Sequence, residues 1–300
     1  MNRCGPRLAF ATCVDYPTLL PEDAGLLPAL RARGLDAHHV PWDDPAIDWT
    51  GFEAIVVGGV WGYYKRYPEF LRWLERIERT AVPIWNPPEL VRWNSDKRYL
   101  RDLAERGIRI IPTAFVDAGA SARLSDILRA NDWTDAVVKP SVSACGYRTI
   151  RVGPPDADRH QQHLDTILES SGALVQRFMP EINIEGEWSA SFYAGTLSHA
   201  VLKRPAATDY RVQHRYGGSC APRQPPAWLL PQLRAVLDAL PHQAAYARVD
   251  GICHGRDFYL MEAELIDPSW FFDAHPAAID RYADLLASLV TATVDRLQRR

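Results

Sequence analysis

Residues 248–264, with the sequence RVDGICHGRDFYLMEAE, carry the clearest structural signal in the chain. A His-Gly pair at positions 254–255 separates two largely apolar segments, which is typical of a β-hairpin with a tight turn. Side chains two positions apart on a strand point to the same face of a sheet, so the charged residues of each segment project together. The hairpin therefore predicts one charged face, formed by Arg248, Asp250, Glu262 and Glu264.

This predicted face carries three carboxylates next to apolar residues such as Phe258 and Leu260. Carboxylates this close would repel one another strongly unless a cation lay between them. A hard divalent cation such as Mg²⁺, held by carboxylates and by substrate phosphates, removes that repulsion. The alternative is a solvated charged face with an Arg–Glu pair, which fits less well because the strands are so apolar. The predicted metal ligands are Asp250, Glu262 and Glu264.

The composition limits the classes of protein to which the chain can belong. Its 300 residues suit two domains or one elaborate α/β unit, and 47% hydrophobic and 24% charged residues are ordinary for a soluble globular protein. The net charge of −3 provides no strong attraction to nucleic acid or to a membrane, and no apolar run is long enough to span one. The five cysteines are widely spaced without a CxxC pair, so we expect no disulfide framework and a cytoplasmic location.

Lysine is rare in this chain, because four of the 34 basic residues are lysines and the rest are arginines. Lys139 and Lys203 each end an apolar, strand-like segment, and Lys97 lies in the first turn of a predicted helix. Lysines at the ends of buried strands point toward the ligand side of a sheet, where the following loop can bind phosphates through its backbone N–H groups. Each lysine alone is more simply a surface charge. Together with a magnesium-type cluster, the three indicate phosphate binding.

The first 92 residues alternate strand-like and helical segments. Short apolar strands separated by helices with one apolar face predict an open parallel sheet. Ligands of such sheets bind beyond the carboxyl ends of the strands, where we expect the loops 13–17 and 61–64. The expected strands are 7–14, 36–40 and 52–57, and the expected helices are 22–33 and 68–80.

The remaining chain contains further strand and helix patterns. Asn94 or Ser95 can cap a helix that runs to about residue 106, and residues 108–111 have the pattern of a strand. A loop of small residues, 140–148, follows Lys139. The other expected strands are 136–138, 149–152, 173–178, 188–193, 196–202, 245–252 and 257–264. The other expected helices are 125–130, 159–170, 228–240 and 277–297. Residues 205–226 form a polar stretch.

In this combination the motifs resemble the ATP-grasp superfamily, over roughly residues 94–269. The resemblance implies an α/β (α+β) fold in which ATP lies between two subdomains, with an N-terminal open parallel-sheet domain (the pre-ATP-grasp domain) beside the substrate site. The implied ranges are 1–92 for this substrate domain, 93–174 for the central subdomain and 175–300 for the C-terminal subdomain with the metal site. The implied cofactors are ATP and Mg²⁺.

The resemblance also assigns residues of the nucleotide site. Lys97 and Lys139 match the first and second nucleotide lysines, and Lys203 matches the third phosphate-side cation. The segment from Ser141 to Arg148, which contains Gly146, is similar to the flexible loop that closes over the phosphates. The hinge corresponds to Gln176, Arg177, Phe178 and Met179, with the backbone of Arg177 and Met179 at the adenine edge. Glu187 matches the ligand of the ribose hydroxyls, and Arg248 matches the cation near the transferring phosphoryl group. The metal ligands correspond to Asp250, Glu262 and Glu264.

A narrower resemblance concerns the substrate. Residues 198–205, 209–213 and 93–99 are similar to a small glutathione-synthetase-like group that includes D-cycloserine synthetase. Many members of that group have Arg-Ser-Thr-Trp-Asp-Tyr where this chain has GGVWGY at 58–63. The resemblance implies a small amino-acid-like substrate, whose carboxylate an arginine could pair bidentately. The residues expected around this substrate are Asp15, Tyr16, Trp61, Tyr63, Arg211 and Ser269.

The implied reaction is phosphorylation of a carboxylate by ATP and attack of a nucleophile on the resulting acylphosphate, with Arg248, Lys203 and Arg211 as catalytic residues. Three functions stay open at this point. The first is ring closure of an amino acid such as O-ureido-D-serine by its own nitrogen. The second is intermolecular amide ligation, as in glutathione synthetase or D-alanine–D-alanine ligase. The third is a regulatory protein that binds ATP without turnover. No nucleic acid or membrane partner is expected, and the sequence leaves a homodimer open.

Overall fold

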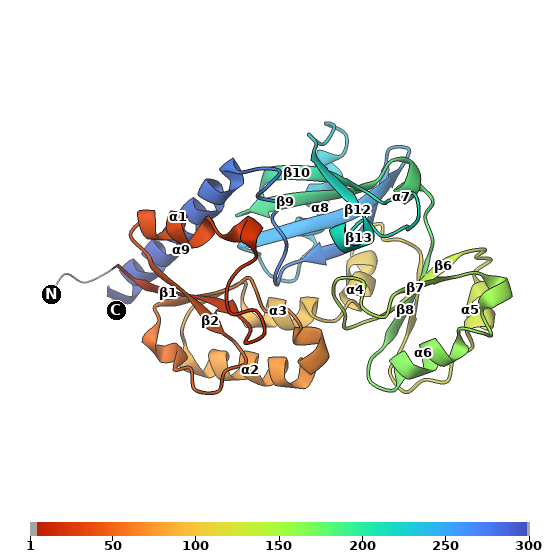
Figure 1. The fold of residues 1–300 in the computed structure, drawn as a ribbon, viewed down its shortest axis with the longest axis horizontal. Coiled ribbons are helices and arrows are strands. Elements are labelled where there is room, and N and C mark those ends of the chain that lie inside the picture. Colours follow the sequence, from red (N-terminus) through yellow and green to blue (C-terminus); the bar gives the residue numbers. More distant parts are fainter. Residues whose placement is uncertain (1–4, 299–300) are drawn as a thin grey trace.

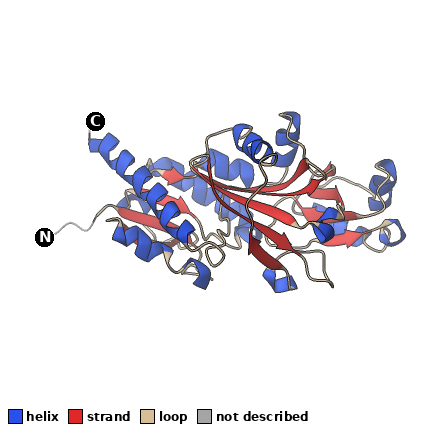
Figure 2. Ribbon diagram, turned by 90° about the horizontal axis from the view of Figure 1, so that it is seen from above, coloured by secondary structure: helices blue, strands red, loops and turns tan. Residues whose placement is uncertain are grey.

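The computed structural model describes residues 5–298, whose strands form three sheets (Figure 1). A first sheet near the N-terminus and a second sheet in residues 113–177 lie toward opposite ends of the molecule, and the third sheet lies between them. Figure 2 shows the strands of this third sheet from above as long, twisted ribbons. Among the described residues, no helix combines the length and the apolar character needed to cross a membrane.

The first sheet is parallel throughout, as the alternating pattern predicts. Helix α2 (Tyr67–Thr80) repeats apolar residues every three or four positions, so that Phe70, Leu74 and Ile77 are buried against one face of this sheet. Helix α1 (Leu26–Ala32) buries its leucines against the other face. In spatial order, the strands are β2 (Asp36–Pro41), β1 (Arg7–Thr12), β3 (Ala54–Val57) and β4 (Ile84–Trp85).

The C-terminal helix α9 (Ala277–Gln298) packs beside α1 on the first sheet (Figure 1). Its residues Leu286 and Val290 share one buried cluster with Leu8 and Leu30. The end of the chain therefore contacts its beginning. The domain ranges inferred from the resemblance remain a prediction, because this last helix spans from the third range onto the first.

The second sheet is antiparallel and is covered on one face by two helices, α5 (Leu124–Ala130) and α6 (Gln161–Leu168). Leu128 and Leu164 of these helices are buried together with Val138 and Val175 of the sheet. In spatial order, the strands are β5 (Thr113–Val116), β8 (Ala173–Arg177), β6 (Ala136–Pro140) and β7 (Ile150–Val152).

The third sheet is antiparallel and contains the predicted hairpin of residues 248–264. Helix α8 (Leu230–Asp238) covers its outer face, and the short helix α7 (Glu181–Ile184) leads into it from β8. In order, the strands are β11 (Ser219–Pro222), β10 (Thr196–Arg204), β9 (Glu187–Tyr193), β12 (Tyr246–His254) and β13 (Asp257–Glu264). Short 3₁₀ helices lie at Pro21–Asp23, Trp49–Gly51, Tyr63–Arg66, Pro154–Asp156 and His214–Tyr216.

The helix predicted from residue 94 to about 106 is wrong, because two helices occupy this region. Helix α3 (Pro88–Asn94) and helix α4 (Tyr99–Glu105) are separated by a connector that contains Lys97. The backbone N–H of Lys97 donates to the carbonyl of Ser141 at 2.7 Å, outside either helix. Asn94 caps neither helix, since its side chain bonds to strand β13 instead.

Two strand predictions also need correction. Residues 108–111 form no strand. This segment makes only an isolated bridge and a few backbone hydrogen bonds to the third sheet around Leu260, and the strand β5 begins at Thr113. The polar stretch 205–226 contains the short edge strand β11, which its composition did not indicate.

A β-bulge in the hairpin determines which residues of β13 face inward. Asp250 pairs with Glu262, but Gly251 pairs with Leu260, so Met261 is the extra residue. A bulge breaks the alternation of a strand, and Met261 therefore lies beside Glu262 on the face that lines the cavity described below. A β-carbon at Gly251 would lie 2.4 Å from both the Phe258 ring and the Tyr259 carbonyl, so only glycine fits here without a shift.

We expect Gly251→Ala to lower the free energy of unfolding by about 1–3 kcal/mol, because the added methyl group overpacks a rigid site. Gly59→Ala is the matched control, since its β-carbon would meet its nearest atoms at 3.4–3.5 Å, which is ordinary contact. Urea denaturation of both variants measures the difference. Equal stability of the two variants would show that Gly251 is not needed at the bulge.

Candidate functional site

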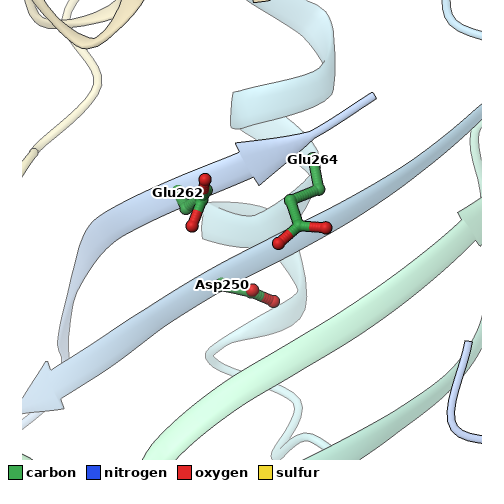
Figure 3. A group of neighbouring side chains, drawn as sticks. All are labelled: Asp250, Glu262 and Glu264. Carbon is green, nitrogen blue, oxygen red and sulfur yellow. The ribbon is translucent and has the colours of Figure 1, made fainter. Parts of the chain in front are cut away.

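The three predicted metal ligands converge in the structure. Asp250 on β12 and Glu262 and Glu264 on β13 point toward one another (Figure 3), and each offers an oxygen within 4.8 Å of the others. Asp250 is 2% exposed, whereas the two glutamates are partly exposed to the cavity. The register of the hairpin places Asp250 directly opposite Glu262 and Glu264 opposite Arg248.

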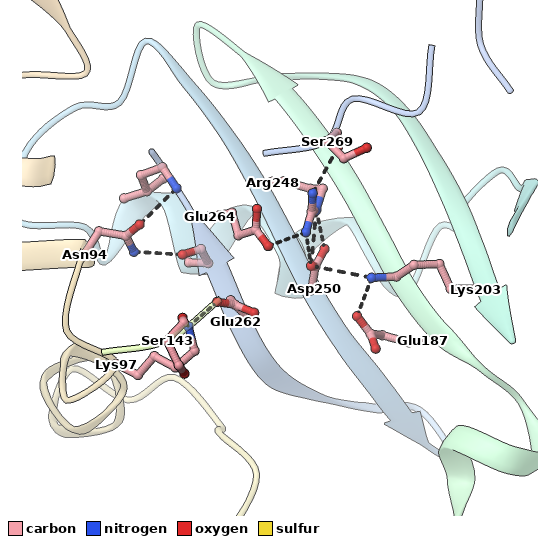
Figure 4. A network of polar contacts seen from close by, with 12 residues as sticks. Asn94, Lys97, Ser143, Glu187, Lys203, Arg248, Asp250, Glu262, Glu264 and Ser269 are labelled. Atoms are coloured by element: carbon pink, nitrogen blue, oxygen red, sulfur yellow. Dashed lines mark hydrogen bonds and ion pairs between the residues drawn. The ribbon is translucent and has the colours of Figure 1, made fainter. Parts of the chain in front are cut away.

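Arg248 joins two of these carboxylates (Figure 4). Its guanidinium donates to both oxygens of Asp250 at 2.7–3.1 Å and to Glu264 Oε1 at 2.5 Å. The remaining nitrogen, Nη1, donates to the carbonyl of Ser269 at 3.0 Å. A buried arginine held by two carboxylates is fixed in position, and so are its partners.

The two carboxylates bonded to Arg248 differ in their electrostatics. Burial raises the pKa of Asp250, but Arg248 and Lys203 outweigh this effect and bring the pKa down to about 2. Burial raises the pKa of Glu264 to about 7, with Glu262 and Asp250 adding to the increase and Arg248 opposing it. Three carboxylates held side by side in a largely buried place suit the cluster to a divalent cation.

Two of the three predicted phosphate-side lysines reach this cluster. Lys203 Nζ donates to Glu187 Oε1 at 2.5 Å and lies 3.6 Å from Asp250 Oδ2 (Figure 4). Lys97 Nζ donates to Glu262 Oε1 at 2.6 Å and to the carbonyl of Ser143 at 2.6 Å. Burial alone would lower the pKa of both ammonium groups, but the carboxylates outweigh it and raise both values.

Lys139 on β6 differs from the other two lysines. No carboxylate of residues 5–298 lies within ion-pair distance of its ammonium group. Burial lowers the pKa of Lys139 to about 8; Glu262 opposes this shift and the nearby Lys97 adds to it. A buried cation without a partner has the most to gain from an incoming anion.

All these groups line one cavity of about 1030 Å³. Its charged end is the cluster just described. Its other end is apolar, and its aliphatic, methionine and aromatic side chains come from both the second and the third sheet. These apolar residues are Ile111, Val137, Phe178, Met179, Ile182, Tyr210, Val212, Ile252 and Met261.

The predicted hinge, Gln176 to Met179, lies at the apolar end. The backbone N–H of Arg177 already donates to the carbonyl of Pro112 at 2.8 Å, so it is not available to a ligand. For the N–H of Met179, no hydrogen-bond acceptor is found among residues 5–298. Met179 therefore keeps a backbone donor for a planar heterocycle, whereas Arg177 does not.

The loop predicted to cover phosphates lies over the cavity. A β-carbon at Gly146 would lie 3.7–3.8 Å from Arg211, Arg215 and Tyr216, so this loop approaches the segment that follows β10. Tyr147 of the same loop contacts Tyr64, with ring centroids 5.1 Å apart.

Ser141 does not line the cavity. It is fully buried, and its Oγ lies 3.2 Å from Ser171 Oγ behind the loop. Its predicted contact with the nucleotide needs correction, because the side chain is turned into the second sheet.

The residues expected around the substrate all line the same cavity: Asp15, Tyr16, Trp61, Tyr63, Arg211 and Ser269. Tyr16 and Trp61 form an edge-to-face pair at 5.6 Å, which joins the two loops at the ends of β1 and β3. Arg211 is engaged by Asp209, to which its Nη2 donates at 2.7 Å, and it lies 3.5 Å from the ring centre of Tyr216. A substrate carboxylate would have to compete with Asp209 for this arginine.

Several residues of the site were not predicted from the sequence. Asn94 donates to Ala263 O at 2.7 Å and accepts from Leu265 N at 3.0 Å, so it holds the strand on both sides of Glu264. Asp23 and Asp267 also line the cavity. No local motif marks these residues, because their partners are far away in the sequence.

The chain is similar in sequence and in fold to known proteins. Residues 8–86 match a family model described as "D-cycloserine synthetase DcsG, N-terminal domain". The cycloserine biosynthesis protein DcsG of Streptomyces lavendulae is 35% identical over 182 residues, which are 59% of this chain and 60% of that protein. This sequence match thus spans less than two thirds of the relative's length.

Solved structures extend the likeness over nearly the whole chain. The crystal structure of D-cycloserine synthetase DcsG superposes with a TM-score of 0.85 at 28% identity, covering 95% of this chain and 99% of that one. D-Alanine–D-alanine ligase from Bacillus anthracis, in complex with ATP, gives a TM-score of 0.69 at 17% identity, covering 98% and 99%. At this low identity, the match to D-alanine–D-alanine ligase shows a shared fold and nothing more. Together the matches confirm the predicted ATP-grasp fold with its N-terminal parallel-sheet domain.

Proposed function

We propose that this chain, with its ATP-grasp fold and its similarity to D-cycloserine synthetase, is an ATP- and Mg²⁺-dependent ligase that closes a ring. It would phosphorylate the carboxylate of an amino-acid-like substrate, and a nitrogen of the same molecule would then attack the activated carbonyl. O-Ureido-D-serine is the substrate that the similarity suggests.

The two-ended cavity is the observation that carries this proposal. Its apolar end, with the free N–H of Met179, suits a nucleotide base. Its other end brings Lys97, Lys203 and Arg248 together with carboxylates, which suits a polyphosphate and a metal ion. Glu187 lines the same cavity beside Lys203, and we assign it to the ribose hydroxyls.

Asp250, Glu262 and Glu264 would hold Mg²⁺. Their fit rests on three carboxylate oxygens within 4.8 Å of one another, and on the burial and neighbouring carboxylates that raise the pKa of Glu264 to about 7. When bound, the metal would neutralise charge on the phosphates.

The residues of the chain would position the reactants and stabilise charge. One carboxylate oxygen of the substrate attacks the γ-phosphorus, and ADP leaves. The ureido nitrogen bonded to oxygen then attacks the carbonyl carbon and loses its proton, and inorganic phosphate leaves with the oxygen it gained. The ring nitrogen still carries the carbamoyl group, and addition of water to this group would release it as carbon dioxide and ammonia to give D-cycloserine. Arg248 is held rigidly by Asp250 and Glu264, so it can stabilise the transferring phosphoryl group without reorganisation.

A one-substrate assay tests the ring closure. We expect ADP formation with ATP, Mg²⁺ and O-ureido-D-serine alone, with D-cycloserine as the product detected by mass spectrometry. ADP that forms only after a second amine is added would favour an intermolecular ligase. ATP binding without ADP formation, across a broad panel of amino acids, would favour a regulatory protein.

The unpaired Lys139 predicts a pH dependence of nucleotide binding. Its pKa of about 8 in the free protein should rise when phosphates bind, so binding above pH 8 must take up a proton. We expect the affinity for ATP to fall by up to about tenfold per pH unit above this value. Calorimetry in buffers of different ionisation enthalpy measures the proton uptake. Lys139→Arg is the matched control because arginine stays charged. The same uptake in this variant would contradict the assignment.

A further inference from the structure

A second carboxylate site lies in the cavity, away from the metal ligands. Asp23 ends the 3₁₀ helix Pro21–Asp23, which follows the loop at the end of β1. Its side chain lines the cavity together with the apolar residues Phe10, Leu20 and Leu26. Asp23 is 9% exposed, and its Oδ1 is sealed from solvent without a hydrogen-bond partner. A buried carboxylate oxygen without a partner is rare, since its desolvation is costly.

The charged groups around Asp23 do not neutralise the negative charge of its carboxylate. Within residues 5–298, no cationic group lies within ion-pair distance of its carboxylate. Glu22 and Asp273 are its acidic neighbours; burial raises the pKa of Asp23 to about 7, and these two carboxylates add to the increase. The side chain is thus held in a place where it lacks both a donor and a positive charge. A ligand that enters the cavity can supply both.

We infer that Asp23 binds the ammonium group of an amino-acid substrate. This inference rests on the proposed function and adds the recognition of the substrate's amine to it. The carboxylate and the ammonium group of an α-amino acid share one carbon, so a substrate that lies between Arg248 and Asp23 would offer each of them a group of opposite charge. An ammonium group supplies both the donors and the charge that the buried carboxylate lacks.

Other acidic residues of the cavity fit this role less well. Asp267 lies within the electrostatic influence of Glu264, Glu262 and Lys97, so it belongs to the charged end. Asp15 is exposed to solvent, where an ion pair contributes little. Asp23 alone among the three combines burial with a sealed oxygen that has no partner.

The experiment compares O-ureido-D-serine with its deamino analogue, 3-(ureidooxy)propanoate, which lacks the amine. Binding of each compound is measured by calorimetry in the presence of Mg²⁺ and a non-hydrolysable ATP analogue, and ADP formation is measured separately. We expect the wild type to prefer the amine by about 100-fold, the range for a charged hydrogen bond in a buried site. Asp23→Asn should remove most of this preference, raising the KM for the amino compound while the KM for ATP changes less than about twofold.

Asp273→Asn is the matched control, because it removes a neighbouring charge from an exposed residue outside the cavity lining. It should keep the preference of the wild type. Asp23→Ser serves as a second variant should the asparagine variant not fold. A preference that survives in the Asp23 variants would overturn the inference, as would the absence of any preference in the wild type.

The two proposals can fail separately. Amine-selective binding without ADP formation would overturn the proposed ligase function and support the role of Asp23. ADP formation with an unchanged preference in Asp23→Asn would overturn the role of Asp23 and support the ligase function.

Discussion

Glu262→Gln is expected to lower kcat by about a hundredfold to a thousandfold, the range for removing one group that stabilises the transition state electrostatically. The substitution keeps the shape of the side chain but removes a charge from the proposed Mg²⁺ site. It also takes away the partner of Lys97, which donates to Glu262 at 2.6 Å. Turnover should therefore become strongly dependent on the magnesium concentration.

Glu78→Gln is the matched control for this change. Glu78 also accepts from a basic residue, Arg92, at 2.9–3.0 Å, but this pair lies on the surface and away from the cavity. We expect its kcat to equal that of the wild type. The comparison is made by ADP release at saturating and at limiting magnesium. Near-normal turnover of Glu262→Gln at limiting magnesium would contradict the metal assignment.

Arg248→Met is expected to abolish turnover and also to destabilise the fold, by about 3–5 kcal/mol. Arg248 is 6% exposed and bonds to Asp250, Glu264 and the carbonyl of Ser269. Methionine fills much of the same space but leaves two carboxylates without their cation. Thermal and urea unfolding measure the loss of stability, and ADP release measures the loss of turnover.

A second substitution separates the two effects of Arg248. Adding Glu264→Gln to Arg248→Met removes one of the stranded carboxylates, so stability should be partly restored. Glu264→Gln alone is the reference for turnover, because Glu264 is itself a proposed Mg²⁺ ligand, and the double variant should stay well below this reference. Arg33→Met is the surface control, because Arg33 pairs with Asp280 and Asp284, whose side chains are largely exposed. Restored turnover in the double variant would show that Arg248 acts only through the fold.

The hairpin could be predicted because its evidence is local. Charged residues at two-residue spacing, apolar neighbours and a His-Gly turn all lie within 248–264. The converging positions of Asp250, Glu262 and Glu264 followed from the alternation of a strand. The bulge at Met261 did not, since it depends on how Gly251 packs under Phe258 across the hairpin.

The break between α3 and α4 shows why local patterns failed elsewhere. Asn94 and Ser95 are good helix caps by residue type. Asn94 instead satisfies backbone groups of β13, whose sequence lies about 170 residues away, and Lys97 bonds through its backbone to Ser141. Such partners are set by the tertiary fold, so they override a propensity of about 1 kcal/mol.

Asp23 could not be recognised from the sequence for a related reason. In the segment Pro21–Asp23 it has the place of an ordinary acidic residue in the first turn of a helix, where such residues are favoured by the helix dipole. Its burial without a partner depends on the tertiary fold, which brings it into one cavity lining with Phe10, Leu20 and Leu26. A residue's lack of partners is a property of the fold rather than of the sequence.

Transfer of a labelled oxygen shows whether ATP phosphorylates the carboxylate of the substrate. O-Ureido-D-serine with both carboxylate oxygens replaced by oxygen-18 is incubated with the protein, ATP and Mg²⁺, and the inorganic phosphate and the ring product are analysed by mass spectrometry. Activation through an acylphosphate predicts one labelled oxygen in each phosphate released and one in each ring carbonyl. Formation of ADP with unlabelled phosphate would contradict the account, because the substrate carboxylate would then never have been phosphorylated.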